Sequence, residues 1–239
     1  EAGQSVAGRC GLVNLNPGSH GRDGILIKAE DEADIVDGQT WHDFCVPYLV
    51  EQDLAIGGPD GPTLTLTDGV VMRFGRSAGI VAGIDADSPG QFEVTGSTER
   101  SVTLGGIEEG PGSWKGVTFS PFVDPAGVSN SLYFARVENG GSADQAMVRV
   151  HCPTLPTLDS VFANAPGYPL EIVPSAVADL TEGLASTAAS AFQGNAVQRI
   201  KVLAAGSEPD ILENSSWKHP GVPLELDGDL SWRGGTRDV

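Results

Sequence analysis

Residues Gly112 to Phe119, which read GSWKGVTF, form the stretch of sequence that decides the fold class. The second half, KGVTF, alternates small or polar residues with Val117 and Phe119, a pattern typical of a strand with one buried face. Just ahead of it, Trp114 stands between two glycines. Glycine allows two backbones to approach closely. We therefore expect Gly112 and Gly116 to bring neighbouring strands together.

Short segments of the same kind recur along the chain. Each is alternating or β-branched and is closed by Gly, Pro, Asn, Asp or Ser. They cover residues 63–67, 69–75, 79–83, 91–96, 100–106, 115–119, 131–141, 146–150, 158–165 and 169–173. One alanine-rich segment, 176–193, fits either an amphipathic helix or tight stacking of strands. The sequence therefore predicts an all-β chain with one short helix at most.

The spacing of these segments separates two all-β architectures. A sandwich of hairpins predicts Asn-Gly or Asp-Gly turns between neighbouring strands, but the Asp-Gly pairs here stand mostly between segments of unequal pattern. Small-residue turns return about every 8–12 residues and like segments about every 20, which is typical of a solenoid with several short strands per coil. We therefore predict stacked coils around a dry column of Val, Leu and Phe.

A longer repeat relates the two ends of the chain. EADIVDGQTWHDFCVPYLVEQDL (32–54) aligns without gaps with EPDILENSSWKHPGVPLELDGDL (208–230), and Trp41 matches Trp217. Self-similarity of this kind indicates a repeated structural unit. We therefore divide the chain into three predicted parts: the end of one unit (1–40), one full unit (41–216) and the start of the next (217–239).

The order of these segments resembles a known family. TLTLTDGVVMRFG, GQFEVTGSTERSVTLGG, GSWKGVTF and SLYFARVENGG follow one another as in secreted bacterial repeat proteins of the pectate-lyase-like superfamily, of the surface-protein or lipoprotein type. The resemblance covers residues 41–239 and implies a right-handed parallel β-helix in an extracellular or cell-surface location. In a coil of this family, Trp114 is expected to cap or flank the stack of strands. The motifs include no catalytic residue. The resemblance therefore implies a structural spacer, an adhesin or a glycan-contacting scaffold.

The charge of the chain restricts its partners. It has 32 acidic and 14 basic residues, a formal net charge of −18, and no basic run that would attract phosphate backbones or anionic lipid. No stretch approaches the roughly 18 apolar residues of a membrane span. We therefore expect neither nucleic acid nor membrane insertion. The expected partners are polysaccharide or cell-surface glycan and, through open coil ends, further copies of the chain.

Four residues are candidates for contact with a ligand or a metal. Trp41 and Trp114 offer indoles for stacking on sugar rings, although packing is the favoured interpretation of both. Asp85 and Asp87, in the stretch DADSPG, supply carboxylate oxygens for calcium but lack the twelfth-position glutamate of an EF-hand loop. Calcium is therefore the one cofactor for which the sequence contains candidates.

A polysaccharide lyase or hydrolase of the same fold is the alternative function. Such a site needs carboxylates on stacked coils and a base nearby. Besides Asp85 and Asp87, the candidates are Glu108, Glu109, Arg100, Lys115 and Arg136. Nothing in the sequence brings them to one face, and no Gly-x-Ser-x-Gly elbow is present. We therefore favour a non-catalytic module, and a self-assembling filament subunit is a further alternative.

The cysteines leave the redox compartment open. Cys10, Cys45 and Cys152 lie far apart and match no metal-binding spacing. One disulfide with an odd thiol and three reduced thiols both fit the sequence. His151, next to Cys152, suggests either a reactive pair or simply the end of a strand.

Overall fold

The computed structural model describes residues 23–29, 33–123, 130–154, 156–180, 191–204, 217 and 220–230. Nearly all regular structure in them is short β-strand, and the strands form three sheets, here called A, B and C. Every pair of neighbouring strands in these sheets is parallel. This confirms the predicted all-β chain. It also excludes a sandwich of antiparallel hairpins for the described residues.

Each sheet takes its strands from successive coils of the chain. Sheet A contains, in spatial order, β1 (Ile25–Ile27), β3 (Tyr48–Val50), β6 (Val71–Phe74), β9 (Val102–Gly106), β12 (Ala135–Glu138), β14 (Val161–Ala163) and β16 (Phe192–Gln193). Sheet B contains β4 (Leu54–Ile56), β7 (Gly79–Ala82), β10 (Gly116–Phe119), β13 (Val148–Val150), β15 (Leu170–Ile172), β17 (Ile200–Leu203) and β18 (Leu224–Asp227). Sheet C contains β2 (Gln39–Trp41), β5 (Thr63–Thr67), β8 (Gln91–Thr95) and β11 (Ser131–Tyr133).

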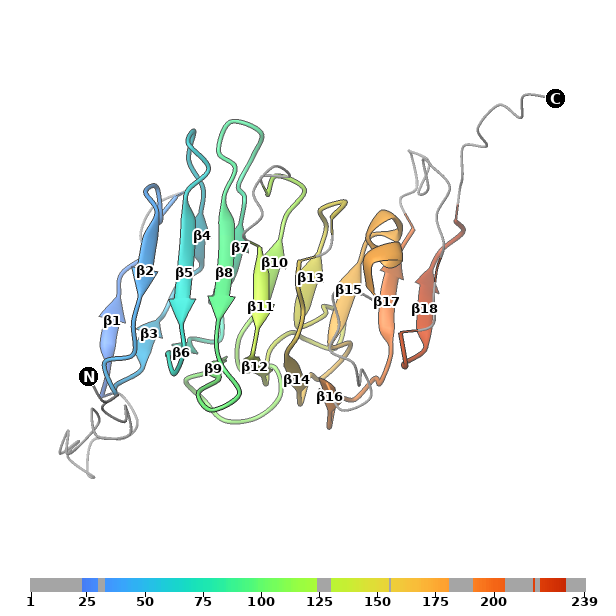
Figure 1. Cartoon of the computed structure of the whole chain (residues 1–239). Helices are drawn as coiled ribbons and strands as arrows, with labels where there is room; N and C mark the ends of the chain where they lie inside the picture. The colour runs from blue at the N-terminus through green and yellow to red at the C-terminus, as the bar shows by residue number, and fades with distance from the viewer. Residues whose placement is uncertain are drawn as a thin grey trace, which may run out of the picture.

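From β2 to β13 the chain visits the three sheets in a constant order. It runs from sheet C to sheet A to sheet B, so that β2, β3 and β4 form one coil and β5, β6 and β7 form the next. From β14 to β17 the described strands alternate between sheets A and B. Figure 1 shows the strands side by side, from β1 near one end of the molecule to β18 near the other. This arrangement is consistent with a β-helix-like solenoid.

All ten predicted strand segments contain strand in the structure, but one of them holds two strands. Residues 131–141 include β11 of sheet C and β12 of sheet A. The break lies at Phe134, whose φ of 50° is in the left-handed region, which bulky residues rarely adopt. The alternation of residue types did not mark this corner.

The predicted helical segment, 176–193, overlaps a short 3-10 helix, η2 (Pro174–Asp179). Proline suits the start of such a turn because its φ is already helical and its missing N–H has no partner there. Residues 181–190 lie outside the described part of the chain. At the end of the segment, Phe192 belongs to β16 and pairs with Phe162 of β14, so strand stacking applies there. No helix among the described residues has the length and apolar character to cross a membrane.

The interior consists of apolar side chains that stack from coil to coil. In sheet B, Val117 pairs with Ile80 on one side and with Val148 on the other. In sheet A, Leu104 pairs with Val137. All five side chains are fully buried, and burial of one such side chain contributes about 1.5–3 kcal/mol. The predicted dry column is therefore confirmed.

Trp114 lies inside this core, not at its edge. Its exposed fraction is 1%, its ring stacks on Phe74, and its indole N–H donates to the carbonyl of Glu138 over 2.8 Å. The close approach predicted at Gly116 is confirmed: its φ is 97°, and a Cβ there would overlap the carbonyl oxygen of Met147. The expectation that Trp114 caps or flanks the stack is corrected accordingly.

The predicted division at residues 40 and 216 stays a prediction. The strand that follows the first Val-Pro pair is β3, in sheet A, whereas the strand that follows the matching pair is β18, in sheet B. Sequence-equivalent segments therefore occupy different sheets. Residues 205–216 and 231–239 lie outside the described part of the chain.

Candidate functional site on the outer face of sheet B

One continuous row of outward-facing side chains crosses sheet B. The register pairs its members in the order Ala55, Val81, Thr118, Arg149, Glu171, Lys201 and Glu225. Neighbouring strands lie about 4.8 Å apart, so each side chain is within reach of the next. From Arg149 onward the charges alternate in sign, so that residues of opposite charge are paired in register on neighbouring strands.

Glu171 is the centre of the charged half of this row. It is buried, and His151 Nε2 lies 3.0 Å from its Oε1 while Lys201 Nζ lies 3.3 Å from its Oε2. Burial alone would raise the pKa of Glu171, but the hydrogen bond with His151 and the charge of Lys201 bring it below its ordinary value. Lys201 also contacts Asp227 over 2.8 Å, and this bond is the main reason that the pKa of Lys201 is raised.

A hollow of about 380 Å³ lies beside the far end of the row, and Tyr168, Lys201, Glu225 and Asp227 are among its lining residues. The Tyr168 hydroxyl donates to Glu225 Oε1 over 2.8 Å, and Arg199 donates to Glu225 Oε2 over 2.8 Å. The bond to Glu225 raises the pKa of Tyr168. The polar groups of this hollow therefore bind mainly to one another.

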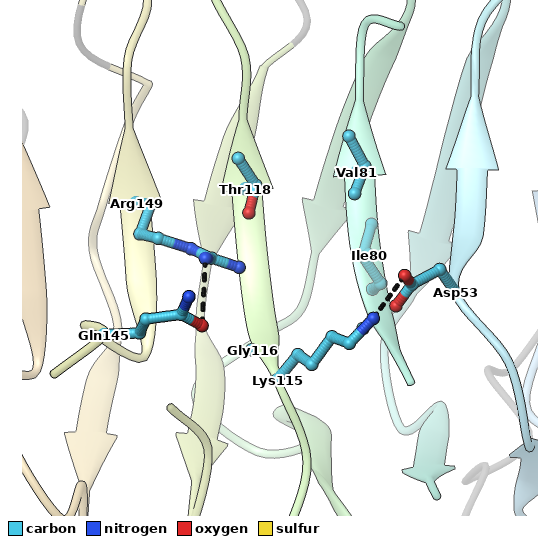
Figure 2. Close-up of a pocket in the computed structure, with 9 residues that line it drawn as sticks. Asp53, Ile80, Val81, Lys115, Gly116, Thr118, Gln145 and Arg149 are labelled. Atoms are coloured by element: carbon cyan, nitrogen blue, oxygen red, sulfur yellow. Dashed lines mark hydrogen bonds and ion pairs between the residues drawn. The ribbon is translucent and has the colours of Figure 1, made fainter. Parts of the chain in front are cut away.

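A second hollow, of about 320 Å³, lies at the start of the row. We call it the Arg149 hollow; its polar walls are Asp53, Lys115, Thr118, Gln145 and Arg149, and its floor includes Gly79, Ile80, Val81 and Gly116. The two glycines are paired in register, so the floor at these positions consists of backbone without side chains. Figure 2 shows Arg149 extending from β13 over β10, and Lys115 extending across the sheet in the same direction, from the start of β10 toward Asp53.

The hydrogen-bond donors of the Arg149 guanidinium are poorly satisfied in this position. Its NH1 donates to Gln145 Oε1 over 3.4 Å, beyond the usual 2.7–3.2 Å of such bonds, and its Nε is buried without an acceptor. Among the described residues, no carboxylate lies within ion-pair distance of it. Burial lowers the pKa of Arg149, and the charges of Glu171 and Asp53 offset part of that effect.

The two candidate sugar-stacking tryptophans lie in different environments. Trp114 is buried, so it has no ring face open to a ligand. Trp41 is partly buried, stacks on Tyr48 with ring centroids 4.9 Å apart, and donates to Gln39 Oε1 over 3.0 Å. One face of Trp41 is therefore covered by Tyr48. Sugar stacking on Trp41 stays a prediction.

The candidate calcium ligands form a tight turn. Asp85 Oδ1 accepts the backbone N–H of Asp87 over 2.9 Å, and Asp85 and Ser88 form an isolated antiparallel bridge. Asp85 thus stabilises its own loop, as Asp commonly does in turns. In the part of the chain that the structure describes, no three Asp, Glu, His or Cys side chains converge on one point. Calcium binding by Asp85 and Asp87 stays a prediction without a visible third ligand.

The basic residues considered for a lyase site are dispersed among ion pairs. Lys115 Nζ lies 2.5 Å from Asp53 in sheet B, and Arg136 lies 2.7 Å from Glu138 in sheet A. Arg100 is paired with Asp43 and, more loosely, with Asp68. Glu108, finally, pairs with Arg76 over 2.9 Å. The structure does not bring these candidates together in one groove.

The cysteines are in two oxidation states. Cys45 is disulfide-bonded, whereas Cys152 is a free, buried thiol; Cys10 lies outside the described residues. The alternative of three reduced thiols is therefore wrong. Cys152 donates to the carbonyl of Thr154 over 3.1 Å, and burial raises its pKa to about 11. Its thiol is consequently protonated at neutral pH and does not form a reactive pair with His151.

Sequence reasoning missed the charged row and Arg149. A signal for them exists: VRV (148–150), LEI (170–172), IKV (200–202) and LEL (224–226) each hold one charged residue between two apolar ones. In a strand, such a residue points away from the core. The signal locates the outward face but says nothing of which strands are neighbours, and neighbour order is what creates the Arg149 hollow.

Comparison with protein-family models, with curated proteins and with solved structures finds no match to this chain. Its function is therefore inferred from its own geometry.

Proposed function

We propose that the chain is a right-handed parallel β-helix module that acts outside the cell as a non-catalytic spacer or scaffold. The observation that supports this most strongly is the unbroken parallel register of sheets A and B, from β1 to β16 and from β4 to β18. Each coil is hydrogen-bonded to the next and shares one apolar column with it. Stiffness along the stack is what a spacer requires.

Two further observations support an extracellular location. Cys45 is disulfide-bonded, and stable disulfides are typical of oxidising compartments. The net charge of −18 favours solubility and opposes non-specific adhesion to other acidic surfaces. Both properties suit a module displayed at a cell surface.

The distribution of ion pairs supports a non-catalytic role. A general base or acid works best when its pKa is near the working pH and its proton can move to a substrate. Lys115, Arg136 and Arg100 are instead each held by a carboxylate. A lyase of this fold is the rival, and it predicts unsaturated products that absorb near 235 nm when the chain is incubated with polysaccharides.

Stiffness can be tested by a distance measurement between the two ends of the stack. Leu26 and Leu226 are exposed, and cysteines at these positions accept fluorophores while the buried Cys152 reacts slowly. We expect one narrow distribution of transfer efficiencies in single-molecule experiments. A broad or multiple distribution, with β-structure intact by circular dichroism, would contradict the spacer. Turnover of any polysaccharide would contradict the non-catalytic assignment.

A further inference from the structure

In the charged half of the row on sheet B, from Arg149 to Glu225, every side chain except Arg149 has an oppositely charged group within ion-pair distance. Glu171, which is next to Arg149 in register, bonds on its other sides: one carboxylate oxygen contacts His151 and the other contacts Lys201. Among the described residues, Arg149 therefore has a formal positive charge with only the amide oxygen of Gln145 as a hydrogen-bond acceptor. A half-buried guanidinium with unused donors is costly, since an unsatisfied group loses hydration without replacing it.

The space in front of Arg149 is shaped to admit a small molecule. Gly79 and Gly116 contribute a floor without side chains to the Arg149 hollow, and Thr118 places a hydroxyl beside the guanidinium in Figure 2. The volume of about 320 Å³ is at the small end of the range of ligand sites, about 300–1,000 Å³. The hollow therefore suits a single small molecule and not a large cofactor.

The two sides of the Arg149 hollow carry groups that would bind different parts of a ligand. Arg149 offers a planar fork of N–H donors, which matches a carboxylate in a bidentate arrangement. On the opposite side, the Asp53 side chain is 42% exposed and its Oδ2, which contacts Lys115, retains a lone pair for a further donor; its Oδ1 is buried without a hydrogen-bond partner among the described residues. This carboxylate would accept from a hydroxyl. A ligand with one carboxylate and several hydroxyls satisfies both sides.

We propose that the Arg149 hollow binds a small hydroxylated monocarboxylate, with Arg149 donating to the carboxylate and with Thr118 and Asp53 bonded to the hydroxyls. The net charge of −18 repels polyanions at long range, so the ligand carries a single negative charge. This inference goes beyond the spacer role and does not depend on it, because a scaffold needs no ligand.

The first test is a titration of the full ¹⁵N-labelled chain with sodium D-gluconate at constant ionic strength, maintained with sodium chloride. We expect saturable shifts of the Arg149 Nε–Hε signal and of the amides of β10 and β13. Sorbitol, which has the same hydroxylated chain without the carboxylate, should bind at least about tenfold more weakly, since bonds to charged groups are the strong ones. N-acetylglycinate, a carboxylate without the hydroxyls, should also bind more weakly.

Three variants test whether the signal shifts arise from binding in the Arg149 hollow. Arg149→Gln should weaken gluconate binding at least about tenfold, and Val81→Phe should block the hollow while leaving Arg149 in place. Arg136→Gln is the matched control, because Arg136 also faces outward but pairs with Glu138 in sheet A; it should bind gluconate like the unaltered chain. The amide spectrum of each variant reports whether the fold is intact.

Several results would overturn the proposal. One is the absence of saturable shifts with gluconate; another is equal binding by Arg149→Gln and Arg136→Gln. Equal binding of sorbitol and gluconate would exclude recognition of the carboxylate. Equal binding of N-acetylglycinate and gluconate would exclude recognition of the hydroxyls by Thr118 and Asp53.

Discussion

Phe74 and Trp114 stack in the interior with their ring centroids 4.5 Å apart and their planes 13° from parallel. Phe74 belongs to β6 of sheet A, and Trp114 precedes β10 of sheet B. The contact therefore connects two coils and two sheets. Trp114 also donates to the carbonyl of Glu138 at the end of β12, so a single side chain joins its own segment to two others that are distant in the sequence.

We expect Trp114→Ala to lower the free energy of unfolding by about 3–5 kcal/mol, as large aromatic truncations in cores do. The change creates a cavity next to Phe74 and leaves the Glu138 carbonyl without its donor. Urea unfolding followed by circular dichroism measures this cost. Trp41→Ala, at a partly buried position, is the comparison and should cost clearly less. Equal costs would show that Trp114 does not have the central role described.

Gly116 and Gly110 form a matched pair for testing close backbone approach. Their φ angles are 97° and 101°, but a Cβ at Gly116 would overlap Met147 whereas one at Gly110 meets nothing within 4 Å. Gly110→Ala should therefore cost only the backbone strain, about 1–3 kcal/mol. Gly116→Ala should cost more by about 1–3 kcal/mol of overpacking. Unfolding curves that coincide for the two variants would contradict the close approach.

The buried Glu171 predicts a loss of stability in acid. Its pKa in the folded state lies below the ordinary 4.5, so its contribution is complete above pH 4.5 and is lost as pH falls through the lowered folded value. At pH 7, Glu171→Gln should be less stable than the unaltered chain by about 1.5–3 kcal/mol, the range for bonds to charged groups.

That difference should shrink as the pH is lowered toward 3, and urea unfolding at several pH values measures it. Glu108→Gln is the control at neutral pH, because Glu108 and Arg76 are mostly exposed and such pairs contribute only about 0–1 kcal/mol. A difference between Glu171→Gln and the unaltered chain that stays constant from pH 7 to pH 3 would show that the carboxylate of Glu171 is not stabilised by His151 and Lys201.

The two described cysteines should differ in reactivity. Burial raises the pKa of Cys152 to about 11, so at pH 8 only a very small fraction is thiolate, which is the reactive form. In peptide mapping after iodoacetamide treatment, Cys152 should be alkylated only when the chain is unfolded, and Cys45 only after reduction. Rapid labelling of Cys152 in the folded chain would contradict its burial, and labelling of Cys45 without reductant would contradict its disulfide.

Strand positions were predictable because they depend on local chemistry. The alternation in TLTLT and KGVTF, together with the small residues that close each segment, is enough to place β5 and β10. The absence of hairpin turns between like segments also indicated stacked coils in advance. Phe134 was missed because a non-glycine residue at a φ of 50° has no reliable signal in the sequence.

The sequence by itself determined where β5 to β15 lie and which of their residues face the core, because alternation with period two is a property of each segment alone. The strands β1 to β4, β17 and β18 were not among the predicted segments. Only the tertiary structure decided which segments are neighbours. Register across coils of unequal length places Thr118 beside Arg149 and Arg149 beside Glu171, and it buries Trp114 while leaving Trp41 partly exposed. The physical reason is that neighbour choice depends on stacking free energy between distant segments, which no local pattern encodes.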